Sequence, residues 1–416
     1  MKFKILTYLI VILIFINCIS CDSAVMPVYT VTGKVIDLNN SAQADLKVTI
    51  ADQSVVSSGD GSFSLNNITF PYDVTVLNER NRTAILYKGL SKSNISLKLN
   101  YEGTGYDFST LIVRLPESII NKDTYGKLIF TDGNFINGYG SIFPDEQQSI
   151  ITIYINRTVT GKLILLTYRK LNGEIVSYEN YGEIPEVQIN PGSDYNFQFD
   201  SLDIMLDPGE QKVTGNLNLP EGLHSTRTSF YLSFSSKKIS NRFVEFTEIS
   251  SDQPGYIIPT GLPAQYLAMT VNHSIGNSGA GMGSSYEEFI TDPVGGNEFD
   301  VKSFPILIMP EDKSININNN TQFSFSDRSG SGVYVIYLLD RSREVNYEIV
   351  TSERNFTLEG LESLGLGSIN NNNFFWLIQK TGTGSMDDYV TNFSDNPGYI
   401  LLYSEGRTFS TAPVLE

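Results

Sequence analysis

The sequence has very few of the residues on which metal sites and most catalytic sites depend. Only two of its 416 residues are cysteine and only two are histidine, and Cys18 and Cys21 both lie at the start of the chain. No cysteine is left for a disulfide or a thiolate ligand after Cys21. His224 and His273 have no second ligand beside them, which argues against a zinc site or a serine–histidine–acid triad. We therefore expect no catalytic residues, no metal and no cofactor.

Basic charge is also scarce. The chain has 29 Lys and Arg against 46 Asp and Glu, a formal net charge of −17 at pH 7, and no basic cluster. Such a surface repels nucleic acid and anionic lipid headgroups. No apolar run reaches the roughly 20 residues that a membrane-spanning helix needs. We expect no nucleic-acid partner and no spanning helix.

The first 21 residues have the pattern of an export signal. Lys2 and Lys4 precede an apolar run over residues 5–16, and the segment ends in Cys18-Ile19-Ser20-Cys21. This ending resembles a bacterial lipobox, although Cys18 stands where the family usually has a leucine-like residue. The resemblance implies a signal peptide over residues 1–20, a lipid on Cys21 and a short tether over residues 21–29. An ordinary cleaved signal and an uncleaved anchor are the alternatives.

The lipobox resemblance also implies a location. The protein would be anchored through its N-terminal lipid to the outer membrane or the cell surface. Asp22 follows the cysteine, and in some bacteria that residue retains lipoproteins at the inner membrane, so that membrane remains an alternative.

Abundant aromatics, glycine-rich turns and period-two alternation favour an all-β chain. There are 23 Tyr, 24 Phe and 34 Gly, and apolar residues alternate in many short segments. The length allows about four small domains. We predict a tandem array of β-sandwich modules over residues 30–100, 101–212, 213–303 and 304–416. Modules of this size would be modestly stable, and a string of them would form a stalk.

The first module resembles the carboxypeptidase regulatory-like domain, a transthyretin-like β-sandwich. The resemblance is carried by residues 31–37 (VTGKVID), 46–50 (LKVTI), 60–68 (DGSFSLNNI) and 71–76 (PYDVTV). Gly33 belongs to the first motif. Asp60 and Gly61 would form a hairpin turn, because glycine accepts a positive φ, and the resemblance implies that Phe63 packs inside. These are fold residues, and the family name implies no peptidase. A metal-binding or catalytic role for Asp60 is the alternative.

The second and third modules share two landmarks, which predicts that they are repeats. Residues 113–117 (VRLPE) match 217–221 (LNLPE), and residues 204–208 (IMLDP) match 306–310 (ILIMP), at offsets of 104 and 102 residues.

The fourth module resembles a fibronectin type III domain. The resemblance is carried by residues 323–325 (FSF), the alternation from Tyr334 to Leu338, residues 356–361 (FTLEGL) and residues 373–378 (NFFWLI). Trp376, the only tryptophan, is expected in its core.

Three patterns could carry function, and each has a simpler explanation. Residues 276–285 are glycine-rich but lack a Gly-Lys-Ser/Thr ending, which favours a surface loop. Acid pairs at 287–288 and 387–388 would point to opposite faces of a strand, so solvated loops are the default; a calcium site stays open. Four tyrosines beside glycine-rich loops could stack on sugars, although most tyrosines in such chains pack in cores: Tyr101, Tyr106, Tyr139 and Tyr181.

These observations predict a membrane-anchored, non-enzymatic structural or binding protein of adhesion type. An envelope protein or a glycan would be its partner. A carbohydrate-binding accessory lipoprotein of a glycan-uptake system is one alternative. An acid-only glycoside hydrolase is the other, and it would need two carboxylates facing each other across a cleft.

Overall fold

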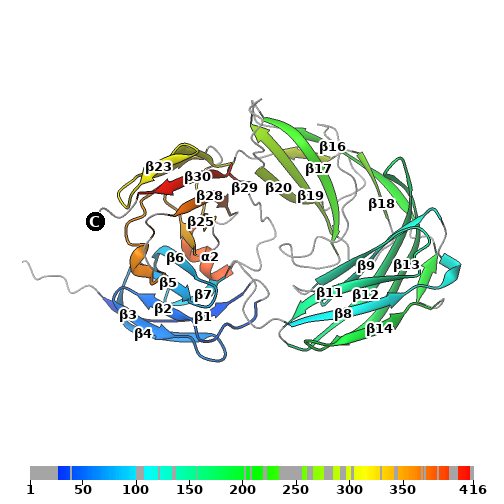
Figure 1. The fold of residues 1–416 in the computed structure, drawn as a ribbon, viewed down its shortest axis with the longest axis horizontal. Coiled ribbons are helices and arrows are strands. Elements are labelled where there is room, and N and C mark those ends of the chain that lie inside the picture. The colour runs from blue at the N-terminus through cyan, green and yellow to red at the C-terminus, as the bar shows by residue number, and fades with distance from the viewer. Residues whose placement is uncertain are drawn as a thin grey trace, which may run out of the picture.

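The chain is nearly all β, which confirms the predicted fold class (Figure 1). The computed structural model describes residues 27–37, 40–99, 107–119, 122–133, 137–155, 157–200, 203–206, 209–218, 223–233, 255–259, 266–275, 284–290, 297–300, 304–327, 330–341, 345–366, 369, 372–381, 384–392 and 402–412. Within these ranges α2 (Met386–Asn392) is the only α-helix. None of the described helices is long and apolar enough to cross a membrane.

The first module is a sandwich of seven strands. They are β1 (Val28–Ile36), β2 (Lys47–Ile50), β3 (Gln53–Val56), β4 (Ser62–Thr69), β5 (Tyr72–Asn78), β6 (Thr83–Leu90) and β7 (Asn94–Lys98). One sheet has the order β4-β1-β7, and the facing strands have the order β3-β2-β5-β6. Strand β1 pairs antiparallel with β4 and parallel with β7. Apolar residues alternate along these strands, and their buried faces meet in one core.

The second module repeats this topology. Its strands are β8 (Asp107–Arg114), β9 (Thr124–Thr131), β10 (Asn137–Ile142), β11 (Gln148–Ile155), β12 (Val159–Leu171), β13 (Glu174–Ile189), β14 (Asp194–Gln198) and β15 (Ile204–Leu206), with a 3-10 turn η1 (Glu117–Ile119). The sheets have the orders β11-β8-β14 and β10-β9-β12-β13-β15. As in the first module, the first strand lies between an antiparallel and a parallel neighbour.

The third module has the same central arrangement in its described strands. They are β16 (Glu210–Asn218), β17 (Leu223–Ser233), β18 (Gly255–Pro259), β19 (Tyr266–Ile275), β20 (Ser284–Ile290) and β21 (Asn297–Asp300). Strand β16 pairs antiparallel with β18 and parallel with β21, and β17-β19-β20 form a second sheet. The first three modules therefore share one strand pattern.

The two sequence landmarks occupy different kinds of position. Arg114 ends β8 and Asn218 ends β16, so the first landmark falls at equivalent places in the second and third modules. The second landmark falls on β15, which pairs with β13 of the second module, and on β22 (Ile306–Met309), which pairs with a strand of the last module. The two copies of the second landmark therefore do not lie on equivalent strands.

The last module is a sandwich with a short and a long sheet. The short sheet contains β22, β24 (Phe323–Ser326) and β27 (Asn355–Phe356). The long sheet contains β23 (Ser314–Ile317), β25 (Tyr334–Asp340), β26 (Asn346–Thr351), β28 (Asn373–Lys380) and β30 (Arg407–Thr411), with β29 (Leu402–Tyr403) beside β28. A 3-10 turn η2 spans Glu362–Leu364. Trp376 is fully buried, 5.2 Å from Phe323 and 6.1 Å from Phe356 between ring centroids.

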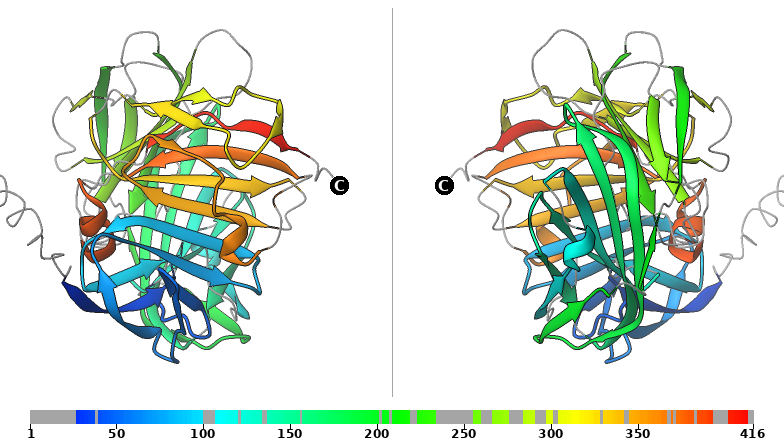
Figure 2. Two further views of the ribbon diagram at one scale, coloured as in Figure 1. Left: turned by 90° about the vertical axis from the view of Figure 1, so that its left-hand side faces the viewer. Right: turned by 90° about the vertical axis from the view of Figure 1, so that its right-hand side faces the viewer.

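The first and last modules share one continuous sheet, which the sequence did not indicate. Strand β26 pairs in parallel with β6, from Asn346 opposite Thr83 to Val350 opposite Tyr87. The main path of the sheet therefore runs β23-β30-β28-β25-β26-β6-β5-β2-β3. Figure 2 shows the blue strands continuing directly into the orange and red ones. The expected stalk is wrong for these two modules, because strands about 260 residues apart in the sequence are neighbours.

Side chains also join the two modules. Met386, Tyr389 and Val390 of α2 belong to the core of the first module, and so do Val335 and Val350 of the last module. Across the same boundary, the Ser91 backbone N–H donates to the Asp387 carboxylate at 2.9 Å, and Lys88 pairs with Glu353 at 3.0 Å. Residues 27–99 and 304–412 thus form one packed unit, while the cyan and green strands of the other two modules lie in the other half of Figure 1.

Gly33 and Phe63 depend on each other. A Cβ at Gly33 would lie 2.7 Å from Phe63 Cζ and 2.4 Å from the Ile95 carbonyl oxygen. Phe63 is buried in the core of the first module. The absent side chain on β1 therefore leaves room for the phenylalanine ring of the adjacent strand.

Asp60 and Gly61 form a turn, but not a hairpin turn. Strand β3 pairs with β2, and β4 pairs with β1, so the turn crosses between the two sheets. The Gly61 N–H donates to the Ser58 carbonyl at 2.8 Å, and the Asp60 carboxylate accepts from the Ser58 hydroxyl and the Ser62 N–H. The Ser62 hydroxyl is the largest cause that holds the pKa of Asp60 well below its usual range, followed by the Ser58 hydroxyl and the Ser62 N–H.

Gly61→Val is expected to destabilise the protein by about 1–3 kcal/mol. Gly61 has φ +76°, and a Cβ there would lie 2.5 Å from the Val35 carbonyl oxygen, so a β-branched residue is both strained and crowded. Thermal unfolding of the two proteins measures the loss.

The matched control is Asp60→Asn, whose amide oxygen can accept the same hydrogen bonds. At pH 7 this variant should lower the unfolding temperature less than Gly61→Val does, because it keeps the turn and loses only the contribution of the negative charge. Because the folded pKa of Asp60 is depressed, its charge stabilises the fold above the unfolded pKa of about 4, and this contribution is lost at lower pH. Asp60→Asn should remove that acid dependence. If it instead abolished a binding activity in a folded protein, the structural role of Asp60 would be wrong.

Candidate functional site

No metal-binding cluster is present in the part of the chain that the structure describes. No group of three or more His, Cys, Asp or Glu side chains lies close enough together there to hold an ion. His224 on β17 and His273 on β19 occupy neighbouring strands, where His224 is opposite Ser274 and Ser225 is opposite His273. The described residues do not include Cys21, Tyr101, Tyr106 or residues 276–283.

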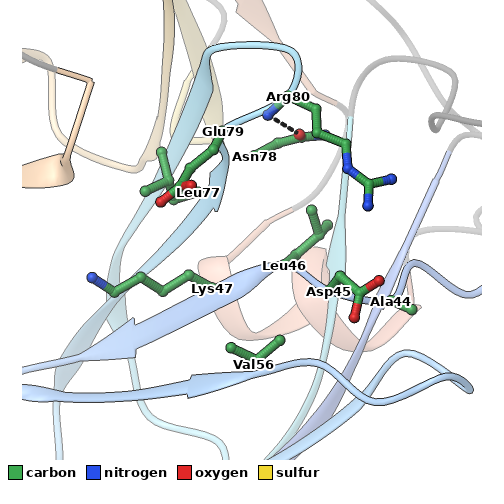
Figure 3. A pocket seen from close by; sticks show the side chains of 9 residues that line it. All are labelled: Ala44, Asp45, Leu46, Lys47, Val56, Leu77, Asn78, Glu79 and Arg80. Carbon is green, nitrogen blue, oxygen red and sulfur yellow. Dashed lines mark hydrogen bonds between the residues drawn. The ribbon is translucent and has the colours of Figure 1, made fainter.

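A mixed-charge hollow lies beside β2 and β5 of the first module. Its volume is about 260 Å³, and Asp45, Lys47, Glu79 and Arg80 line it together with apolar side chains. In Figure 3 the carboxylates of Asp45 and Glu79 lie on opposite sides of the hollow, with Leu46 between them. Lys47 and Arg80 line the same hollow, so its charged side chains are of both signs.

The outer face of the β11-β8-β14 sheet exposes apolar side chains. Phe108 on β8 is 62% exposed and lies directly opposite Tyr154 on β11, which is 56% exposed. Ile150 on β11 is 54% exposed and lies opposite the half-buried Ile112. We call these four residues the outer apolar face. The alternate residues of the same strands, such as Leu111 and Ile153, fill the core on the other side.

A second hollow, of about 390 Å³, lies against β9, β10 and β12 of the second module. We call it the lysine–tyrosine hollow. Its aromatic and polar lining consists of two tyrosines, two lysines, a serine and a phenylalanine: Tyr125, Lys127, Ser141, Phe143, Tyr168 and Lys170. Tyr125 and Tyr168 are opposite each other on β9 and β12. Their rings are almost parallel, with centroids 6.4 Å apart.

The cations of this hollow lie close to its aromatic and hydroxyl groups. Lys170 Nζ is 5.6 Å from the centroid of Tyr125 and 5.7 Å from that of Tyr168. Lys127 Nζ donates to Ser141 Oγ at 2.8 Å. Tyr168 is buried, and burial, with the neighbouring Tyr125 as a lesser cause, raises its pKa to about 12. The Tyr168 hydroxyl is therefore a neutral hydrogen-bonding group at neutral pH, in a hollow that two lysines line.

The tyrosines proposed from sequence as a sugar platform do not form one in the described structure. Tyr139 is exposed on β10, but Tyr181 is buried in β13 and donates a short hydrogen bond to Glu183. Burial raises the pKa of Tyr181. Sequence reasoning missed the tyrosines of the lysine–tyrosine hollow, although a signal was there: Tyr-Gly-Lys at 125–127 and Tyr-Arg-Lys at 168–170 are two Tyr-x-Lys motifs on strands.

A buried charged cluster in the last module has a structural explanation. Lys380 Nζ lies 2.6 Å from the carboxylate of Asp327, whose side chain is fully buried, and the Tyr334 hydroxyl donates to the same oxygen at 2.8 Å. Lys380 also donates to the Gly330 carbonyl. The cluster ties the ends of β24, β25 and β28 together, as expected of a buried charge that is paired and hydrogen-bonded.

Comparison with known proteins leaves the family open. No protein-family model and no curated protein matches the sequence. Among solved structures, the chain is similar to the Bacillus anthracis TIE protein, with 11% identity over 66% of this chain and 49% of that one and a TM-score of 0.18. It is also similar to the tip fimbrial protein Mfa3 from Porphyromonas gingivalis, with 10% identity over 46% and 83% and a TM-score of 0.16.

A third similar structure contains the FN1–FN3 domains of chicken CNTN1, with 10% identity over 70% of this chain and 91% of that one and a TM-score of 0.17. The chain spans about half the length of the Bacillus anthracis protein. Likenesses at this level establish neither a shared family nor a shared activity. The fold class rests on the strands and sheets themselves.

Proposed function

We propose that the chain is a non-enzymatic binding protein of the bacterial surface, of adhesion type and anchored by lipid on Cys21. The observation that carries the binding role is the outer apolar face. Phe108 and Tyr154 form an exposed cross-strand pair, and Ile150 is exposed on the same face four residues away along β11, on a sheet whose opposite side is already filled by core residues. Large apolar side chains that are exposed together on one face of a sheet are candidates for an interaction site.

Charge favours a macromolecular partner over the membrane itself for this face. The chain carries a net charge of −17, which repels anionic headgroups. Polar side chains lie on the same face: exposed Thr152 stands between Tyr154 and Ile150 on β11, and exposed Asn196 on β14 lies opposite Ile112. Aromatic side chains among polar ones are usual in protein–protein contact surfaces. The partner of this face is therefore an envelope protein in this proposal.

A carbohydrate-binding role is the second candidate, and the lysine–tyrosine hollow favours it. Ligand sites are concave, with aromatic walls and a few placed polar groups. Tyr125 and Tyr168 supply the rings, and Ser141 with the two lysines supplies the polar groups.

The double substitution Phe108→Ser with Tyr154→Ser tests the binding face. The lipid-free body, residues 22–416, is immobilised and exposed to envelope extract, and captured proteins are quantified by mass spectrometry. We expect a saturable partner whose capture falls at least tenfold in the double variant, because central aromatic residues carry most of the energy of an interface.

The matched control is Ile308→Ser with Ile315→Ser, which removes exposed apolar residues from the last module instead. This control should retain capture. Equal capture by both double variants, or no saturable partner for the unaltered body, would contradict the role of the outer apolar face. Retained far-ultraviolet circular dichroism shows that each variant is folded.

The lipid anchor has its own test. The full-length chain is expressed in a bacterial host, and the N-terminal peptide is measured by mass spectrometry. We expect a chain beginning at Cys21 and carrying diacylglyceryl and acyl groups, and Cys21→Ser should release the protein from the membrane fraction. An unmodified Cys21 or a retained leader would contradict the anchor.

A further inference from the structure

The lysine–tyrosine hollow has an unusual charge for this chain. The chain has 46 acidic residues against 29 basic ones, yet the ten residues that line the hollow include two lysines and no carboxylate. Lys127 and Lys170 come from adjacent strands of one sheet, β9 and β12, and approach the hollow on the same side as Tyr125 and Tyr168. Two cations concentrated in one hollow of an acidic molecule favour an anionic ligand.

Its aromatic groups favour a ring-shaped ligand. Two parallel tyrosine rings 6.4 Å apart and an exposed Phe143 bound the space. Aromatic faces carry negative partial charge and attract the polarised C–H groups of a sugar ring, as they attract the Lys170 ammonium beside them. A volume of about 390 Å³ is at the lower end for ligand sites, which suits one or two sugar units.

We infer that the lysine–tyrosine hollow binds an acidic sugar unit, a hexuronic acid, within a glycan. The sugar ring lies against Tyr125 and Phe143, and its carboxylate accepts charge-assisted hydrogen bonds from Lys170 and Lys127. Ser141, which already accepts from Lys127, holds that ammonium in place. Burial raises the pKa of Tyr168 to about 12, so its hydroxyl group stays protonated at neutral pH and does not repel the carboxylate.

The net charge of the chain restricts the glycan further. A charge of −17 repels a polymer that carries an anion on every unit, as it repels nucleic acid. The site therefore suits an isolated or terminal acidic unit in an otherwise neutral glycan. This inference rests on the proposed binding function, but it uses strands β9, β10 and β12 and not the outer apolar face on β8 and β11, so that the two can fail separately.

Calorimetric titration of the lipid-free body, residues 22–416, with methyl β-D-glucuronide and methyl β-D-glucoside tests the inference. We expect the glucuronide to bind at least tenfold more tightly than the glucoside, because only it pairs with the lysines. Lys170→Met should weaken glucuronide binding about tenfold and leave glucoside binding unchanged. Raising the salt concentration should weaken the glucuronide alone.

Lys122→Met is the matched control, because Lys122 is an exposed lysine of the same module that does not line the hollow. It should bind the glucuronide as the unaltered body does. Tyr125→Ser should weaken both sugars, and Phe143→Ser, at a more exposed position, provides the same test if Tyr125→Ser unfolds. The inference would be overturned if Lys170→Met and Lys122→Met lost glucuronide affinity equally. It would also be overturned if the two sugars bound with equal affinity or if neither bound. Equal affinity for acetate and glucuronide would reduce the site to a simple anion site and overturn it too.

Discussion

The parallel pairing of β6 with β26 is the contact on which the rest of the architecture depends. It makes the first and last modules two halves of one sheet, although the chain runs through two further modules between them. Both strands are buried on both faces. Ala84 and Leu86 of β6 face the core of the last module, whereas Ile85 and Tyr87 face that of the first. Separating the strands would expose apolar surface on both sides at once, at about 25 cal/mol per Å².

The two candidate binding surfaces lie outside this shared sheet. The second and third modules lie in the sequence between two parts of one folded unit, so they are in effect an insertion into it. The outer apolar face and the lysine–tyrosine hollow both belong to the second module. Rigid strands position both of them: a cross-strand pair sets Phe108 beside Tyr154, and another sets Tyr125 beside Tyr168. Sites built on strands hold their geometry better than sites on loops.

The sequence predicted local features well and long-range pairings poorly. Alternation identified strands such as β4 and β11, and the buried positions of Phe63 and Trp376 follow from their motifs. The Asp60–Gly61 turn was predicted, but not the sheets that it joins, because a turn motif does not specify which strand each arm pairs with. The run at residues 84–87 is apolar on both faces, which indicates a doubly covered strand but not its partner. The lysine–tyrosine hollow could not be predicted, because it depends on the register of β9 against β12, and that register is not encoded in either segment alone.

A designed disulfide between β6 and β26 tests the shared sheet most directly. The body from residue 22 onward has no cysteine, so Thr83→Cys with Asn346→Cys introduces one pair at directly opposed positions. Neighbouring strands lie about 4.8 Å apart, within the range of about 4.4–6.8 Å that a disulfide spans between Cα atoms. Thr83→Cys with Ser352→Cys is the control, because Ser352 lies about 20 Å further along. The account predicts an intramolecular disulfide, identified by peptide mass spectrometry after mild oxidation, in the first variant alone. No disulfide in it, or equal formation in both, would contradict the shared sheet.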